Sequence, residues 1–129
     1  MVELSPSSVH VPQLSDELRA SLSDQRVVRV VLLSPAIFTE GDRPTTLLEG
    51  GHRLIAQSVG RPQVVSGWDV AKSKPKPTRR MAPAGSVYWV ELAEGTSAAE
   101  WAASRFMTCI SDELTDQRHG FGLCVVGVA

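Results

Sequence analysis

The sequence predicts a single small α+β domain in which strands and helices alternate in the order βαββαβ. Two strongly apolar segments, residues 26–33 and 120–128, are typical of buried strands. A capped amphipathic helix precedes the second of them, and two further strand-like segments lie between. The chain has 129 residues, of which 43% are apolar, and this is enough for one hydrophobic core.

Residues 1–25 are predicted to form a leader with one short helix. The first part is rich in Pro and Ser, and leucines then recur every four positions at Leu14, Leu18 and Leu22. This spacing places the three leucines on one face of a helix. The globular domain is therefore expected over residues 26–129.

The first strand is predicted at residues 26–33, "RVVRVVLL", and ends at Ser34 and Pro35. It is β-branched and nearly all apolar, as is typical of a central strand that is covered on both faces. The next residues, 36–60, contain four glycines and show no clean period. We expect a long loop there, followed by either a stunted helix or an extra strand at residues 53–59.

Two more strands are predicted at residues 63–71 and 86–92. The first alternates in part between apolar and polar residues, and the second is rich in valine and aromatic residues. The connection between them is long, basic and rich in proline.

A helix is predicted over residues 97–110. Ser97 is followed three residues later by Glu100, which is the spacing of a capping box. One face of this helix is apolar and consists of Ala99, Ala102, Ala103, Phe106 and Ile110. The last strand follows at residues 120–128, where two spaced glycines lead into an apolar run.

This order of elements fits a ferredoxin-like (RRM-like) fold with a degenerate first helix and a long basic loop between the second and third strands. We expect residues 26–33 and 121–127 to be adjacent central strands of the sheet. The helix at residues 97–110 should pack on one face.

Positive charge is concentrated in one segment of a nearly neutral chain. The whole sequence has 13 Lys+Arg and 14 Asp+Glu, so net charge alone does not indicate a nucleic-acid or membrane binder. Between residues 70 and 90, however, there are five cations and no carboxylate. These cations are Lys72, Lys74, Lys76, Arg79 and Arg80.

Other features argue against several classes of site. Cys109 and Cys124 form no CxxC pair and have no histidine at ligand spacing, so we expect reduced thiols of the core and no metal or disulfide. No phosphate-binding loop typical of a nucleotide cofactor is present, and we expect no cofactor. The sequence shows neither an apolar run of membrane-span length nor a signal peptide, so we expect a cytoplasmic protein with no membrane contact.

Three segments of the sequence resemble one known family. They are "SPAIFTEG" at 34–41, "VGRPQVVSGWDVAKSKPKPTRRMAPAGSVYWVEL" at 59–92 and "HGFGLCVVG" at 119–127. They resemble the C-terminal part of the third subunit of the Cmr complex, the type III-B CRISPR effector. The subunit belongs to the RAMP superfamily of ferredoxin-like RNA-binding proteins, and the resemblance covers roughly residues 12–129.

The resemblance implies a noncatalytic subunit that helps to hold the 5′ handle of the CRISPR RNA in antiviral defence. It implies contacts with the large polymerase-like subunit and with a backbone subunit. Residues 26–129 would be the C-terminal RAMP domain, whereas a full member of the family has another ferredoxin-like domain before it. The chain is then expected to be a domain expressed alone, a fragment, or half of a split subunit whose separate N-terminal RAMP domain is a partner chain.

The basic segment has a physical interpretation as an RNA-binding finger. Pro75, Pro77 and Pro83 stiffen it, so that its cations can follow a phosphate backbone at low entropic cost. Arg79 and Arg80 are the expected specific contacts, because a guanidinium grips a phosphate with two hydrogen bonds or stacks on a base. A solvated loop that serves solubility, or a module that contacts only acidic protein surfaces, is the alternative.

Gly120 and Gly122 match the terminal glycine motif of the superfamily and are candidate RNA contacts through their backbone N–H groups. The alternative is that they only permit a tight turn between a helix and a strand. In the strand at 86–92, Tyr88 and Trp89 point to opposite faces, so one should be buried and the other should meet RNA or a protein.

A histidine-dependent ribonuclease is the remaining alternative, since some RAMP relatives cleave RNA with a histidine. The chain has His10, His52 and His119, and His119 with the adjacent Arg118 is the best candidate for a general base. No acid partner is evident in the sequence, so we expect no catalytic residue.

Overall fold

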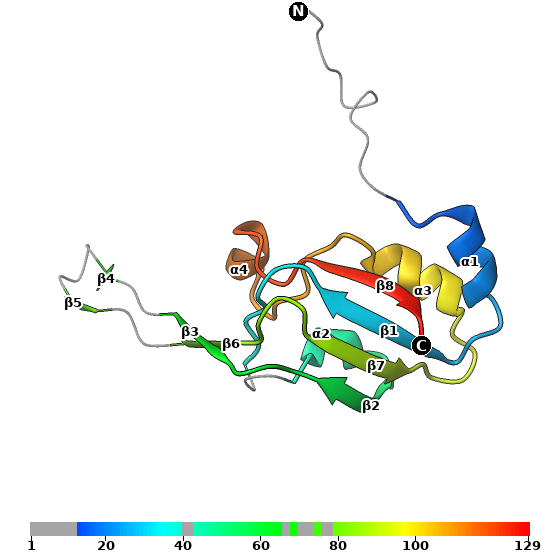
Figure 1. The fold of residues 1–129 in the computed structure, drawn as a ribbon, viewed down its shortest axis with the longest axis horizontal. Helices are drawn as coiled ribbons and strands as arrows, with labels where there is room; N and C mark the ends of the chain where they lie inside the picture. The colour runs from blue at the N-terminus through cyan, green and yellow to red at the C-terminus, as the bar shows by residue number, and fades with distance from the viewer. Residues whose placement is uncertain (1–12, 40–42, 66–67, 70–73, 76–78) are drawn as a thin grey trace, which may run out of the picture.

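The computed structural model describes residues 13–39, 43–65, 68–69, 74–75 and 79–129. Its centre is a four-stranded antiparallel sheet in the order β2-β7-β1-β8 (Figure 1). The four strands are β1 (Val27–Leu32), β2 (Arg53–Ser58), β7 (Val87–Glu91) and β8 (Cys124–Val128). Two helices, α1 (Asp16–Leu22) and α3 (Ala98–Arg105), pack against each other and against this sheet. The α+β architecture is consistent with the predicted ferredoxin-like fold.

The alternation of side chains in β1 shows which face of the sheet is the core. Three of its side chains have exposed fractions of at most 1%: Val28, Val30 and Leu32. On the opposite face Val27 and Val31 are half-buried and Arg29 is exposed. The prediction of a strand covered on both faces is therefore wrong for the part of the chain that the structure describes.

β8 lies at an edge of the sheet, so the prediction that residues 121–127 form a central strand is wrong. The predicted pairing of this strand with β1 is confirmed. Part of its free edge is bonded to the segment after α3, because Met107 N–H donates to the Cys124 carbonyl at 2.8 Å and Cys124 N–H donates to the Thr108 carbonyl at 3.0 Å. This closure and the helical layer over its inner face explain why an edge strand has an apolar sequence.

The neighbour of β7 in the sheet is β2 and not the predicted strand at residues 63–71. The alternative of an extra strand at 53–59 is therefore confirmed, and a four-residue helix, α2 (Thr45–Leu48), precedes it. β2 has little apolar alternation because five of its six residues are exposed, so its sequence lacks the usual period of a half-buried strand. The described parts of the segment 63–71, Gln63–Val65 and Trp68–Asp69, belong to two separate two-stranded sheets instead.

α3 begins where its capping box predicts, and a short helix, α1, forms within residues 1–25 as expected. Ser15 caps α1 by accepting from the N–H of Leu18 at 3.2 Å, and Ser97 caps α3 by accepting from the N–H of Glu100 at 3.3 Å. α3 ends at Arg105 and not at residue 110, because the chain then turns through Met107 at a φ of +58° toward β8. The short helix α4 (Leu114–Arg118) was not predicted.

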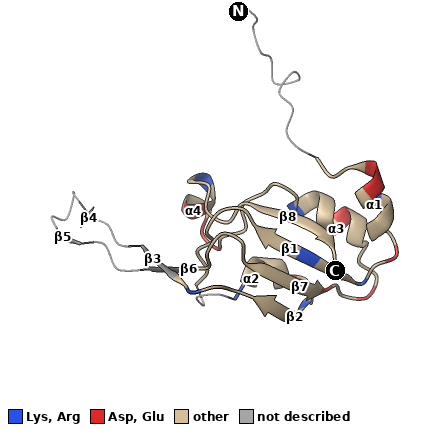
Figure 2. Cartoon of the chain, in the orientation of Figure 1, with Lys and Arg blue, Asp and Glu red and all other residues tan. Residues whose placement is uncertain are grey.

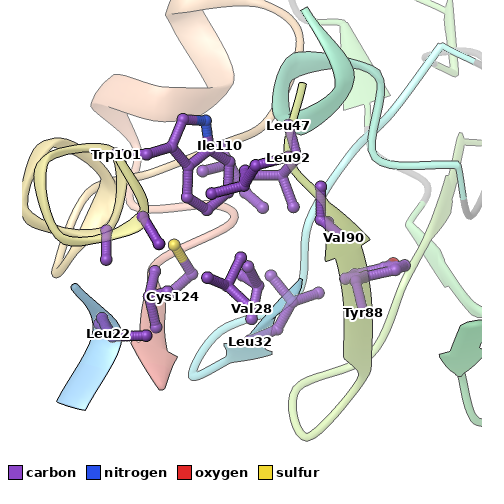
Figure 3. Close-up of a cluster of buried hydrophobic side chains, with 14 of the residues drawn as sticks. Leu22, Val28, Leu32, Leu47, Tyr88, Val90, Leu92, Trp101, Ile110 and Cys124 are labelled. Atoms are coloured by element: carbon purple, nitrogen blue, oxygen red, sulfur yellow. The ribbon is translucent and has the colours of Figure 1, made fainter. Parts of the chain in front are cut away.

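The hydrophobic core lies between the sheet and the helices (Figure 3). Leu22 of α1 is fully buried, and Figure 3 shows it beside β8, where Cys124 is also buried. Tyr88 is fully buried and Phe38 packs against its ring edge-on at a centroid distance of 6.3 Å, while Trp89 on the opposite face is half-buried. The prediction that one of these two aromatic residues is buried is confirmed.

We predict that Leu22→Ala lowers the free energy of unfolding by about 2–5 kcal/mol, because it leaves a cavity between α1 and the sheet. Leu114→Ala is the matched control, since Leu114 is 59% exposed and its loss should cost about 0.5 kcal/mol or less. Urea denaturation followed by circular dichroism measures both values. Equal losses in the two variants would contradict the assignment of α1 to the core.

Candidate functional site

The described parts of the basic segment lie on the strands of a β-hairpin. β3 (Gln63–Val65) pairs antiparallel with β6 (Arg79–Met81), and β4 (Trp68–Asp69) pairs antiparallel with β5 (Lys74–Pro75). Because the second pair is nested within the first, the two arms belong to one hairpin between β2 and β7. Figure 1 shows β3 and β6 leading away from the four-stranded sheet, with β4 and β5 farther from it.

Three of the five cations that are predicted to contact RNA lie on strands of the hairpin. Lys74 belongs to β5, and Arg79 and Arg80 belong to β6. Lys72 and Lys76 lie outside the described residues. The sequence predicts a long basic loop, and the structure shows that the described parts of this segment form a hairpin. Backbone pairing between the arms, as well as proline, therefore restricts their conformation.

The base of the hairpin is fixed to the domain. Met81 and Ala82 are buried directly after Arg80, and the backbones of Ala82 and Ala36 exchange two hydrogen bonds of 2.9 Å. Arg80 is therefore two residues away from a buried backbone pair. This attachment limits how far the start of β6 can move relative to the sheet.

Ser34 organises the glycine turn. Its hydroxyl accepts from the N–H of Gly122 at 3.1 Å and from the N–H of Leu123 at 2.9 Å, and it donates to the carbonyl of Gly120 at 2.7 Å. The N–H of Gly122 also donates to the Pro35 carbonyl at 2.7 Å. The sequence pattern of Ser34 and Pro35 marks the end of a strand and does not indicate this contact with the glycine turn.

Both glycines of the turn have a left-handed backbone, with φ of +84° at Gly120 and +90° at Gly122. A Cβ on Gly122 would lie 2.8 Å from the backbone nitrogen of Ser111, which is closer than real Cβ atoms approach, whereas a Cβ on Gly120 would meet nothing within 4 Å. The geometry supports the structural interpretation of these glycines as turn residues.

The amides of this turn are used inside the protein. Gly120 N–H donates to the Gln117 carbonyl at 3.0 Å, and Gly122 N–H has the two acceptors described above. A phosphate would have to displace these acceptors to bind the two amides. RNA contact by Gly120 and Gly122 remains a prediction, and this conformation does not offer their N–H groups for it.

The segment of residues 34–36 brings the two candidate regions together. Ser34 and Pro35 bind the glycine turn, and Ala36 binds Ala82 at the base of the hairpin. The basic hairpin and the glycine turn are therefore attached to consecutive residues at the same end of β1. Sequence spacing did not reveal this proximity, because the two regions are separated by about forty residues of chain.

A polar cleft of about 370 Å³ lies beside α2 and the end of α3. Asp112 accepts from the N–H of Thr39 at 2.7 Å and from the hydroxyl of Thr45, and Thr46 donates to the Ile110 carbonyl at 2.5 Å. These bonds hold α2 against the loop after α3. They give the polar groups around the cleft a structural role.

Both cysteines are free thiols, and Cys124 is buried in the core whereas Cys109 is half-buried. Burial, together with the proximity of Cys109, raises the pKa of the Cys124 thiol to about 12. Burial also raises the pKa of the Cys109 thiol. Neither is therefore an activated nucleophile. Among the described residues, no group of three His, Cys, Asp or Glu side chains could hold a metal ion.

The described histidines have different surroundings. His52 Nδ1 accepts from the N–H of Ala93 at 2.9 Å, and its ring packs edge-on against Trp101 at 5.8 Å. Burial and the charge of Arg105 lower the pKa of His52. His119 is exposed at the end of α4. Within the described residues, no side chain is hydrogen-bonded to the His119 imidazole. His10 lies outside them.

The family model for the CRISPR-associated protein Cas_Cmr3 matches residues 1–129. The chain belongs to this family. It is a Cmr3-type subunit of the type III-B CRISPR complex, and its partners include other Cmr subunits. A search of curated proteins found no match. No described helix of this Cmr3-type chain is long and apolar enough to cross a membrane.

We predict that Gly122→Ala destabilises the fold by about 2 kcal/mol or more, because it adds a steric clash to an unfavourable φ. Gly120→Ala should cost about 1 kcal/mol, since its φ is also positive but the space beside it is open. Chemical denaturation of both variants measures the difference. If Gly122→Ala were no more destabilising than Gly120→Ala, the close approach to Ser111 would not limit the turn.

Proposed function

We propose that this Cmr3-type chain is a noncatalytic RNA-binding and assembly subunit that helps to hold the 5′ handle of the CRISPR RNA. The basic hairpin would be its principal RNA contact. The observation that carries the proposal is the attachment of a five-cation segment, through paired strands and the Ala36–Ala82 backbone pair, to the end of the central sheet. A charged segment that is held in place loses less entropy on binding than a free loop.

The distribution of charge supports an RNA contact at the hairpin. The segment of residues 70–90 has five cations and no carboxylate, whereas the rest of the chain has a formal charge of −6. Asp16 and Glu17 of α1 and Glu100 of α3 lie on the helical layer, away from β3 and β6 (Figure 2). A polyanion would therefore be attracted to the hairpin in preference to α1, where two carboxylates outnumber the single cation Arg19.

The absence of catalysis is part of the same proposal. His119 is exposed, and in the described residues no carboxylate orients its ring, as a general base usually requires. His52 accepts a backbone hydrogen bond and packs on Trp101, so its position is explained by structure. Cleavage of RNA by the complex would then depend on other subunits.

We predict that replacing Arg79 and Arg80 together with Ala weakens binding of the CRISPR RNA handle by the assembled complex. Each phosphate contact on single-stranded RNA contributes about −0.7 to the slope of log affinity against log salt, so the slope should flatten by about 1.4. Three to five such contacts by the wild-type hairpin would give a total slope of roughly −2 to −3.5. Titration of labelled RNA at several salt concentrations measures this slope.

The matched control is the double variant Arg19→Ala and Arg26→Ala, which removes the same charge from exposed positions on α1 and just before β1. It should leave the salt slope unchanged. An unchanged affinity and slope in the hairpin variant, with normal assembly, would assign the hairpin to solubility or protein contact. An RNA with a scrambled handle distinguishes handle recognition from general RNA binding.

We predict that His119→Ala leaves RNA cleavage by the assembled complex unchanged, because this imidazole has no described partner that would make it a general base. Single-turnover cleavage assays with and without divalent metal measure the rate. Arg118→Ala tests the adjacent cation and should also have no effect on the rate. A large loss of cleavage in a normally assembled His119 variant would instead indicate a ribonuclease.

A further inference from the structure

The face of the sheet opposite the helices is apolar, although no described element covers it. On this face β1, β7 and β8 present mostly half-buried aliphatic and aromatic side chains: Val27, Val31, Val87, Trp89 and Val125. The uncovered face of an antiparallel sheet usually carries polar residues, so this composition is typical of a surface that another protein layer covers. We call these residues, with Arg29, the outer face.

The strand register places Arg29 at the centre of the outer face. Arg29 lies opposite Trp89 of β7 on one side and opposite Gly127 of β8 on the other. A Cβ on Gly127 would meet no atom within 4 Å, so the space above β8 is open beside Arg29. Trp89 and Arg29 thus lie side by side, next to the open space at Gly127. Tryptophan and arginine are among the residue types that contribute most to the binding energy of protein interfaces.

The charge of Arg29 is not balanced within the described residues. Arg29 is exposed, and no described side chain forms an ion pair or hydrogen bond with it. The carboxylate on the same face, Glu91, lies opposite Val27 and is bound by Arg53 of β2 at 3.2 Å. Burial of Arg29 under a second layer would therefore require an anionic group from that layer.

The composition of the outer face favours a protein over RNA as the source of this group. Its aliphatic residues cannot donate hydrogen bonds to riboses or base edges, and Arg29 is its one described cation that has no carboxylate partner. A single phosphate contact would contribute little to RNA affinity. Burial of five aliphatic and aromatic side chains, by contrast, provides a hydrophobic driving force for protein association.

We propose that the outer face docks another subunit of the type III-B complex, through an aliphatic surface that carries an Asp or Glu carboxylate opposite Arg29. The proposal rests on the assembly part of the proposed function and not on RNA binding by the hairpin. Trp89 and the valines supply the apolar contact, and the pair between Arg29 and the carboxylate fixes the orientation of the two layers.

The test is co-expression of the tagged full chain with the other Cmr subunits, followed by nuclease treatment and quantification of the subunits that copurify. Arg29→Glu should reduce copurification about tenfold or more, because it places two carboxylates opposite each other in an apolar interface. Replacing Val87 and Val125 together with Thr keeps the shape and adds hydroxyls, and it should have an effect in the same direction. Arg19→Glu on α1 is the matched control and should copurify like the wild type.

Each variant is also melted alone, so that loss of binding is separated from loss of folding. Wild-type copurification of variants that fold would overturn the proposal. If nuclease treatment removed the other subunits from the wild type, so that wild type and variants no longer differed, the outer face would be assigned to RNA. If the purified wild-type chain self-associated and Arg29→Glu abolished this self-association, the outer face would be assigned to a second copy. The Arg79 and Arg80 variant should copurify normally, so failure of RNA binding at the hairpin remains distinguishable from failure of docking.

Discussion

The hydrogen bonds of residues 34–36 are the constraint on which the arrangement of this domain depends. One serine hydroxyl accepts two backbone N–H groups and donates to a carbonyl in the glycine turn, and Ala36 pairs with the base of the hairpin. The bonds to the amides of Gly122 and Leu123 are partly buried and Ala36 and Ala82 are buried, so an unmade bond there would leave a polar group without a partner in the interior. The segment thus links β1, the turn into β8 and the hairpin before β7, and it determines where the charged arm leaves the sheet.

The sequence was sufficient to predict elements whose signals are local. The Ser97 capping box, the leucine spacing of α1 and the apolar run of β1 each reflect contacts within one element or its burial against the core. It was insufficient for β2, whose exposed residues have no apolar period, and for the edge position of β8. In both cases the deciding interactions are backbone hydrogen bonds between distant segments, which leave no residue pattern.

In the candidate site, too, the sequence predicted the features that depend on local composition and missed those that depend on tertiary contacts. Charge and proline content identified the basic segment, because composition is a local property. The nested pairing of its arms and its proximity to the glycine turn arise from tertiary contacts that sequence spacing does not encode. The glycine positions were recognisable, yet the reason for Gly122 lies in the backbone of Ser111, a residue that no motif had indicated.

The nested pairing of the hairpin also restricts how such an arm can change during evolution. Because side chains alternate along a strand, inserting one residue in a single arm would reverse the side of the hairpin on which every following residue lies. Insertion of two residues in each arm would preserve the register between β3 and β6. It would also leave the Ala36–Ala82 backbone pair at the base of the hairpin unchanged. The length of this arm can therefore change in steps of two residues in each arm, while the sheet that carries it stays the same.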